Sequence, residues 1–314
     1  MHTVLIADIG ATTSRYAVVG LDGRPDRVVT LANDTVSGVD GGIARYLELS
    51  KVRPTAAVLG IAGPIDGDAI ALTNRDWRFK LGDLASRFGL SSVRAINDFE
   101  AVAWSLELVG DGDVRTLGPT AGDAHGAKVV FGPGTGLGVA ALVPTVSGWH
   151  VVATEGGHVL FGPCCDEEEP VFARLRRECG SVSAETVLSG PGLERLHRAL
   201  HGPGEPLTAE VIAKCARDGQ GPACATVDLF VRLLGRFAGD VALTFKATGG
   251  IYIAGGVAQR IQQLLGAEAF RQAFEAHPPY QHLLRAIPTT LITLEQPGLL
   301  GCAVVAAHML QPAE

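Results

Sequence analysis

The chain has little of what marks several specialised classes of protein. Six cysteines in 314 residues, with no Cys-x-x-Cys pair, argue against a disulfide framework. No apolar run approaches the roughly 20 residues that a membrane-spanning helix needs. The N-terminus lacks the basic start of a secretory signal, and Asp8 falls inside its short apolar run. These absences predict a cytoplasmic protein with free thiols and no membrane partner.

Positive charge is also in short supply. Lys and Arg number 26 against 33 Asp and Glu, which gives a formal net charge of −7. Because a nucleic acid or an anionic membrane needs a basic face, neither is an expected partner. Apolar residues make up 47% of the chain and charged ones 19%, as in globular proteins, and the length favours two domains. The 40 glycines have no tripeptide period, so they indicate tight turns and backbone close to a ligand.

The first third of the chain alternates strand and helix signals. Apolar runs predict strands over 4–7, 16–19, 56–62 and 93–96. After the last of these, apolar residues spaced by three and four predict a helix that begins at or near Asp98. Strands that alternate with helices are typical of an α/β domain.

The remainder repeats this organisation. A segment rich in Gly, Asp and Thr, 110–126, predicts the domain boundary, and a strand, turn and strand follow over 127–143. We expect a small α/β domain of 1–110, joined by a C-terminal helix at about 300–314, and a large α/β domain of 111–299. Within the large domain, the spacing predicts a helix over 227–243 and a strand over 251–254.

Two glycine-rich turns, at 8–14 and 132–138, each lie between two predicted strands. Turns without bulky side chains can direct several N–H groups at one anion, so the pair suggests two phosphate sites, although glycine-rich hairpins are also common as plain turns. None of the five lysines (51, 80, 128, 214 and 246) follows a glycine as a P-loop requires. A Rossmann fingerprint is disfavoured because 139–143 continues as a strand where that motif needs a helix.

Carboxylates provide the other candidates. Asp98 lies between a strand and a helix start, where it can cap the helix, accept a hydroxyl proton during phosphoryl transfer, or do both. Glu155 and His158 flank Gly-Gly, which indicates a loop that presents both side chains to a polyhydroxylated ligand. Glu185 precedes a predicted helix, and capping is its default role.

Nine segments together resemble the bacterial glucokinase family of the hexokinase, actin and Hsp70 ATPase superfamily, and they occur in the family's order from Leu5 to about Ala303. They are Asp8–Arg15, Ile61–Pro64, Leu72–Trp77, Ile96–Phe99, Gly132–Gly138, Glu155–His158, Ser183–Glu185 with Leu188–Leu193, Ile253–Val257 and Pro297–Gly301.

The resemblance implies a two-domain actin-like ATPase fold (ribonuclease H-like) with an interdomain cleft. It implies that Asp98 is the general base and that Asp8 holds Mg²⁺, through water. The implied sugar ligands are Asn97, Asp98, Gly136, Glu155, His158 and Glu185. The implied ATP ligands are Asp8, Gly10, Ala11, Thr12, Thr13, Gly134, Thr135, Gly255 and Gly256.

The implied activity is ATP-dependent phosphorylation of D-glucose at the 6-hydroxyl, a step of glycolysis, in a homodimer. A kinase for another hexose or an N-acetylhexosamine is the alternative, and a non-catalytic regulator is a further one. Ala11 stands where the family usually has glycine, which alanine can replace if its φ is negative, and Thr13 replaces an asparagine common in close relatives. The Cys-x-Cys-Gly cluster of related zinc-binding sugar kinases is missing, so no structural zinc is expected.

Overall fold

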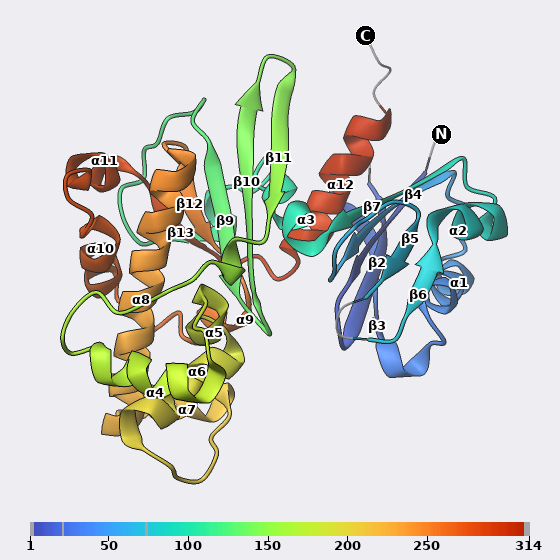
Figure 1. Ribbon diagram of the computed structural model, residues 1–314. Coiled ribbons are helices and arrows are strands. Elements are labelled where there is room, and N and C mark those ends of the chain that lie inside the picture. The colour runs from blue at the N-terminus through green and yellow to red at the C-terminus, as the bar shows by residue number, and fades with distance from the viewer. Residues whose placement is uncertain (1–2, 21, 73–74, 311–314) are drawn as a thin grey trace. The chain divides into compact units, whose positions relative to one another are not determined.

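The computed structural model describes residues 3–20, 22–72 and 75–310. The chain forms two compact units, one of residues 1–110 with 294–314 and the other of residues 111–293. Each unit is built on its own mixed β-sheet (Figure 1). Thr73, Asn74 and positions 311–314 of the expected C-terminal helix lie outside the described residues.

The first unit contains a five-stranded sheet in the order β3-β2-β1-β4-β7. Strand β1 runs parallel to β4, β4 runs parallel to β7, and β2 is antiparallel to both of its neighbours. The six residues of β4 are all buried, which explains their unbroken apolar sequence. The strands of this sheet are β1 (Val4–Ile9), β2 (Thr13–Val19), β3 (Pro25–Ala32), β4 (Ala56–Ile61) and β7 (Ser92–Asn97). A separate ribbon pairs β5 (Ala69–Ala71) with β6 (Arg78–Lys80).

Helices accompany this sheet, and the last of them comes from the far end of the chain. They are α1 (Val39–Ser50), α2 (Leu81–Phe88), α3 (Asp98–Ser105) and α12 (Pro297–Leu310), with short 3-10 turns η1 (Asn33–Thr35) and η2 (Asp111–Asp113), the latter in the second unit. Helix α12 is apolar nearly all round because it packs between α3 and strands β1 and β4. It begins at Pro297, three residues before the predicted start at about 300, and residues 294–299 lie in the first unit.

Glycine lets α12 approach α3 closely. A Cβ atom on Gly301 would overlap the carbonyl oxygen of Ala101, and no side chain fits there. This crossing fixes where α12 begins relative to β1. As a result, Gly298 in the first turn of α12 lies against the carboxylate of Asp8, with an added Cβ only 3.2 Å from its Cγ.

The second unit contains a six-stranded sheet in the order β11-β10-β9-β12-β13-β8. Strands β9, β12 and β13 are parallel, whereas β10 is antiparallel to β9 and β11. The strands are β8 (Val114–Thr116), β9 (Lys128–Pro133), β10 (Leu137–Thr145), β11 (Gly148–Thr154), β12 (Gly250–Ile253) and β13 (Thr289–Ile292).

One long helix organises the rest of this unit. Helix α8 (Gly221–Phe245) starts six residues before the predicted 227 and packs against α6, α7, α10 and α11 (Figure 1). Its Phe237 meets Phe131 of β9 edge to face, with ring centroids 5.4 Å apart. The other helices are η3 (Gly156–His158), α4 (Glu169–Cys179), α5 (Ala184–Val187), α6 (Gly190–His201), α7 (Ala209–Arg217), α9 (Gly256–Arg260), α10 (Ala267–Glu275) and α11 (Gln281–Ala286). Across residues 3–20, 22–72 and 75–310, no helix combines the length and apolar character needed to cross a membrane.

The two sheets share one strand plan. In the first sheet, β2 and β3 join one side of β1 through antiparallel pairings, and β4 and β7 join the other side through parallel pairings. In the second sheet, β9 has the place of β1, with β10 and β11 on the antiparallel side and β12 and β13 on the parallel side. Strands β1, β2, β3, β4 and β7 correspond in this way to β9, β10, β11, β12 and β13, with β8 added at the edge of the second sheet. This arrangement agrees with the expectation of a repeated α/β unit.

Candidate functional site

The first glycine-rich turn connects β1 to β2 and is closed by its own backbone. The N–H of Gly10 donates to the carbonyl of Thr13 at 3.1 Å. Ala11 has a negative φ, so the methyl group that replaces glycine is accommodated without strain. In the described part of the chain, nothing accepts a hydrogen bond from the N–H of Ala11 or Thr12. Two adjacent donors at an exposed tip are suited to bind an anion.

Asn33 of η1 holds this turn in place through hydrogen bonds, a role that sequence reasoning missed. Its side chain is buried, its Nδ2 donates to the carbonyl of Gly10 at 2.8 Å, and its Oδ1 accepts from the hydroxyl of Ser14 at 2.7 Å. Its own N–H donates to the carbonyl of Thr12 at 2.9 Å. An Asn directly after a strand was the available signal, but its partners lie about 20 residues away in sequence.

Asp8 lies near the end of β1, the strand that leads into the turn. Its side chain is 21% exposed, and Nη1 of Arg15 approaches its Oδ2 to 3.6 Å. Burial raises the pKa of Asp8, and the positive charge of Arg15 opposes that rise. A partly open carboxylate beside an anion-binding turn has the chemistry of an Mg²⁺ ligand, since Mg²⁺ prefers oxygen and keeps several waters.

Asn97 and Asp98 end β7 and begin α3, but their roles differ from the capping role considered for Asp98. Asn97 is the N-cap: its Oδ1 accepts from the N–H groups of Phe99 at 2.9 Å and Glu100 at 3.3 Å. Its Nδ2 donates to the carbonyl of Gly63, which follows β4, at 3.2 Å. Asp98 is therefore the first helical residue, with Oδ1 3.0 Å from the N–H of Phe99.

The environment of Asp98 changes its acidity. Burial raises the pKa of Asp98 to about 6, the negative charge of Asp8 adds to the rise, and hydrogen bonds from the start of α3 oppose it. Desolvation of the carboxyl therefore outweighs the stabilisation that the start of α3 gives to its charged form. At pH 7 about nine-tenths of such a group is still ionised. It can therefore accept a proton near neutral pH.

The second glycine-rich turn connects β9 to β10. The N–H of Gly134 donates to the carbonyl of Gly136 at 2.8 Å, and Thr135 is exposed at the tip, as Thr12 is in the first turn. The carbonyl of Gly134 accepts from the N–H of Gly190 at 2.8 Å, where α6 begins. Gly255, with φ +89°, packs beside this turn because a Cβ there would lie 2.6 Å from the carbonyl oxygen of Pro133. Gly256 then starts α9.

Glu185 on α5 is bonded to the second turn. Its Oε2 accepts from the N–H of Leu137 at 2.8 Å, and a Cβ on Gly136 would lie 2.5 Å from the same oxygen. Ser183 and Thr186 form a capping box that holds the start of α5. The expected capping role therefore falls to Ser183, and Glu185 is left to orient the turn.

Glu155 precedes η3 as its N-cap and His158 is the last residue of η3, so the Gly-Gly segment that was expected to be a loop forms a single 3-10 turn. His158 Nε2 lies 3.9 Å from Glu155 Oε2, and the two side chains are 60% and 80% exposed. Gly157 packs so closely on the carbonyl of Leu137 that no Cβ fits, which ties η3 to the strand that leaves the second turn. The second unit thus brings Gly134–Gly136, Glu185, η3 and Gly255 to one end of its sheet.

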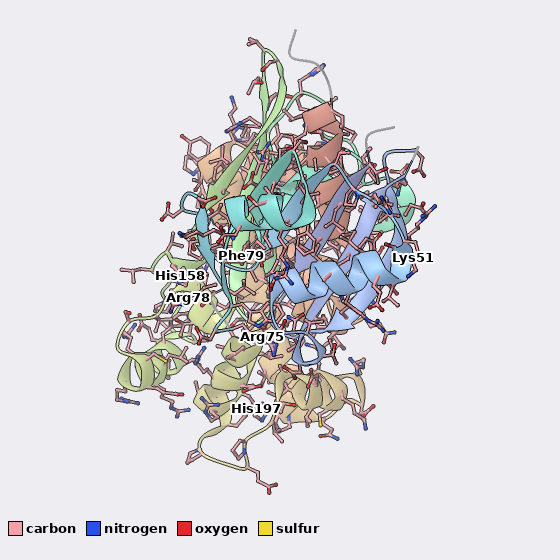
Figure 2. The ribbon with its side chains drawn as sticks, turned by 90° about the vertical axis from the view of Figure 1, so that its right-hand side faces the viewer. Lys51, Arg75, Arg78, Phe79, His158 and His197 are labelled. Carbon is pink, nitrogen blue, oxygen red and sulfur yellow. The ribbon has the colours of Figure 1, made fainter. Side chains whose placement is uncertain are left out.

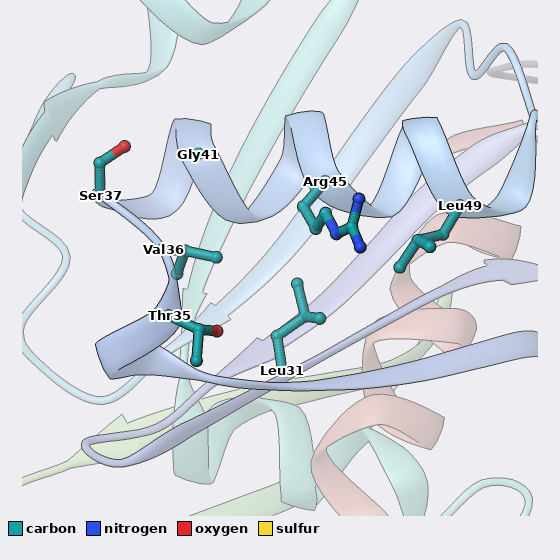
Figure 3. Close-up of a pocket in the computed structure, with 7 residues that line it drawn as sticks. All are labelled: Leu31, Thr35, Val36, Ser37, Gly41, Arg45 and Leu49. Atoms are coloured by element: carbon teal, nitrogen blue, oxygen red, sulfur yellow. The ribbon is translucent and has the colours of Figure 1, made fainter.

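Two other features lie apart from these residues. A hollow of about 540 Å³ lies between the end of β3 and α1, and none of the predicted residues is among those that line it (Figure 3). Among the described residues, one group of side chains, Cys164, Cys165 and Glu168, has ligand atoms close enough for a metal ion. Glu168 is already paired with Arg236 at 2.7 Å, so its carboxylate has a structural partner.

The fold first identifies the class of protein to which the chain belongs. The crystal structure of glucokinase from an Antarctic psychrotroph matches with a TM-score of 0.90 and 30% identity, over 98% of this chain and 99% of that one. This two-sheet α/β fold is that of the sugar kinases. The family model described as Glucokinase matches residues 5–309. The glucokinase of Paramagnetospirillum magneticum (strain ATCC 700264 / AMB-1) is 40% identical over 308 residues, 96% of each chain. The chain belongs to the Glucokinase family.

One relative is a longer protein. The bifunctional protein glk of Paraburkholderia xenovorans (strain LB400) is 36% identical over 312 residues, which are 98% of this chain. The chain spans 49% of that protein, about half of its length. The similarity therefore concerns one part of the longer relative.

Proposed function

We propose that this chain transfers the γ-phosphoryl group of ATP to the 6-hydroxyl of D-glucose. Membership of the Glucokinase family supports the reaction class, and one observation supports the chemistry. Asp98, at the start of α3, combines a pKa of about 6 with a position beside Asp8. A carboxylate that is ionised at pH 7 yet poorly solvated is suited to take a proton from a hydroxyl.

In this proposal the carboxylate of Asp98 accepts the proton of the sugar's 6-hydroxyl as that oxygen attacks the γ-phosphorus. The bond between the γ-phosphorus and its bridging oxygen breaks, and ADP leaves. The negative charge of Asp8 favours the protonated form of Asp98, so it helps Asp98 retain the proton it has accepted. Asn97 caps α3 and thereby holds the adjacent Asp98 in place.

The two turns supply the phosphate donors. The N–H groups at the tips, with the hydroxyls of Thr12 and Thr135, would bind the phosphates of ATP, while Gly255 and Gly256 would face the adenosine. Asp8 would hold Mg²⁺ through water, and the ion when bound would neutralise charge on the phosphates. Thr13 would contribute from the first residue of β2.

The remaining polar residues suit a sugar. Glu155, His158, Glu185, Asn97 and the backbone at Gly136 would bond the hydroxyls of glucose, each of which needs a partner once water is excluded. We further propose that the two units are the lobes of an actin-like ATPase fold, that the sugar lies in a cleft between them, and that the enzyme is a cytoplasmic homodimer of glycolysis.

The test is ADP release with MgATP and a panel of hexoses and N-acetylhexosamines. Turnover with glucose should exceed that with the other sugars, and Asp98→Asn should lower kcat by about 10²–10⁴-fold, the usual contribution of a general base. Glu100→Gln, a neutralised carboxylate in the same helical turn, is the matched control and should keep near wild-type kcat. Near wild-type turnover by Asp98→Asn at saturating sugar would sink the proposed role of Asp98.

Preferred turnover of another sugar would replace glucose as the substrate. A folded chain that binds ATP but phosphorylates no sugar would reject the kinase function.

A further inference from the structure

Arg75 touches the first phosphate turn from a distant part of the sequence. Its Nη1 donates to the carbonyl of Ala11 at 3.4 Å. The side chain is only 22% exposed, although it sits in the segment before β6 (Figure 2). Arg75 was part of a family-like segment in the sequence, but no role was predicted for it.

Two side-chain contacts and one backbone bond hold Arg75 in place. It forms an ion pair with Asp34 of η1, the same short turn that carries Asn33. Its Cζ lies over the ring of Trp77, 5.0 Å from the centroid. The segment that carries it is closed by the N–H of Leu72, which donates to the carbonyl of Trp77 at 3.1 Å. Its orientation toward the turn is thus determined by neighbours on two segments.

The hydrogen bond to Ala11 matters because a free peptide carbonyl can oppose the binding of an anion. A carbonyl oxygen that rotates toward a bound phosphate repels it, and it turns the following N–H away. A donor that binds this oxygen keeps the peptide in the orientation that presents N–H groups. In the second turn, Gly190 supplies that donor to the corresponding carbonyl of Gly134. In the first turn the donor is charged.

We propose that Arg75 is a positioning residue for the phosphate chain of the nucleotide: it binds the Ala11 carbonyl so that the tip N–H groups face the anion. The inference rests on the proposed function, because it takes the first turn to be a nucleotide phosphate site. It predicts that Arg75 affects ligands that carry a phosphate chain and leaves adenosine and glucose unaffected.

The experiment compares Arg75→Ala with Arg78→Ala by calorimetry, using ADP with Mg²⁺, adenosine and glucose as separate ligands. Arg78 is a matched control because it is a nearby arginine whose side chain is 80% exposed and pairs with the exposed Asp76 at 3.6 Å (Figure 2). Arg75→Ala should raise the Kd of ADP about tenfold, the usual effect of losing a hydrogen bond to a charged group. The Kd values of adenosine and glucose should stay within about twofold.

Two further variants keep the test decisive. Arg75→Lys should not restore ADP binding, because an ammonium group cannot reproduce the planar fork that meets Asp34 and Ala11 together. Asp34→Asn removes an 87% exposed carboxylate, so it leaves the fold intact and should still weaken ADP about threefold relative to adenosine. If Arg75→Ala does not fold, the ratio of ADP to adenosine affinity in Asp34→Asn decides.

Equal ADP affinity in the Arg75→Ala and Arg78→Ala variants would overturn the inference. So would a parallel loss of ADP and adenosine binding, which would indicate a structural role only. Wild-type chain that fails to phosphorylate glucose in the same preparation would instead contradict the proposed function, so the two failures are distinguishable.

Discussion

The two glycine-rich turns, which we propose bind phosphate, have the same place in equivalent sheets, yet their tips are held by different means. A charged side chain, Arg75, binds the tip carbonyl of the first turn, and a backbone N–H, that of Gly190, binds the second. Asp8 lies near the first turn and its charge acts on Asp98, and burial raises the pKa values of both carboxyls. The second turn has Glu185, which is bonded to its backbone. The comparison indicates that charged side chains determine the surroundings of the first turn, whereas close packing determines those of the second.

The dependence of activity on pH should show the charged character of the first unit most strongly. As the pH falls through about 6, Asp98 takes up a proton and can no longer act as a base. We expect kcat/KM to fall about tenfold per pH unit below that value. Rates measured from pH 4.5 to 8 with saturating Mg²⁺ check this. A profile that is flat down to pH 5 would contradict the assignment of Asp98.

In the second turn, we expect close packing to affect activity more than charge does. Gly136→Ala places a methyl group against Glu185, which must move and give up its bond to the N–H of Leu137. We expect the KM for sugar to rise on the order of tenfold, since one charged hydrogen bond is lost. Steady-state kinetics with varied glucose give the value. Gly162→Ala is a control with open space around it in the same unit, and its KM should match wild type.

Stability should respond to Asp98 in the opposite direction to activity. The folded-state pKa is about 6, above the usual 3.9 of an unfolded chain, so the folded state binds more protons between these values. The stabilisation by this proton is present below about pH 4 and is lost as the pH rises through about 6. Asp98→Asn should therefore raise Tm at pH 7, by about 2 °C or more.

Thermal melting of Asp98→Asn and wild type at pH 4 and pH 7 measures the difference. The gain in Tm should shrink at pH 4, where the wild-type carboxyl is protonated. An equal gain at both pH values would show that the charge of Asp98 is not its origin.

The smallest effect should come from making the second turn more like the first. Gly134→Ala places alanine where the first turn has Ala11, and a Cβ at Gly134 meets nothing within 4 Å. Because neither residue has a positive φ, we expect KM for ATP to change by less than about twofold. A larger change would show that the two tips are not equivalent.

Much of this arrangement followed from local sequence patterns. The apolar runs located the central strands, and the spacing after Ile96 placed the start of α3 correctly. Strand ends were less accurate: β2 begins at Thr13, three residues before the apolar run, because small polar residues still pair with β1 and β3. Periodicity cannot detect a strand residue whose side chain is polar.

The long-range partners were beyond the reach of any local pattern. Asn97 and Asp98 both favour helix starts, and the bonds that Asn97 Oδ1 accepts from the N–H groups of Phe99 and Glu100 show that Asn97 is the cap, while its Nδ2 reaches the distant Gly63. Arg75 and Asn33 reach the first turn through contacts between segments 23 to 64 residues apart. Glu185 was predicted as a ligand or cap, whereas its bond to Leu137 depends on how α5 packs on β10. The roles of the predicted site residues stay predictions.

The way α12 completes the first unit bears on the order in which the chain can fold during synthesis. The second unit is continuous in sequence, so all of its strands are available once residue 293 has been made. The first unit is interrupted, and the helix that covers β1 and β4 and brings Gly298 to Asp8 is translated after the whole second unit. On the ribosome, the face of the N-terminal sheet that packs against α12 therefore stays uncovered until α12 has been made. The unit whose synthesis begins first is thus the one that is completed last.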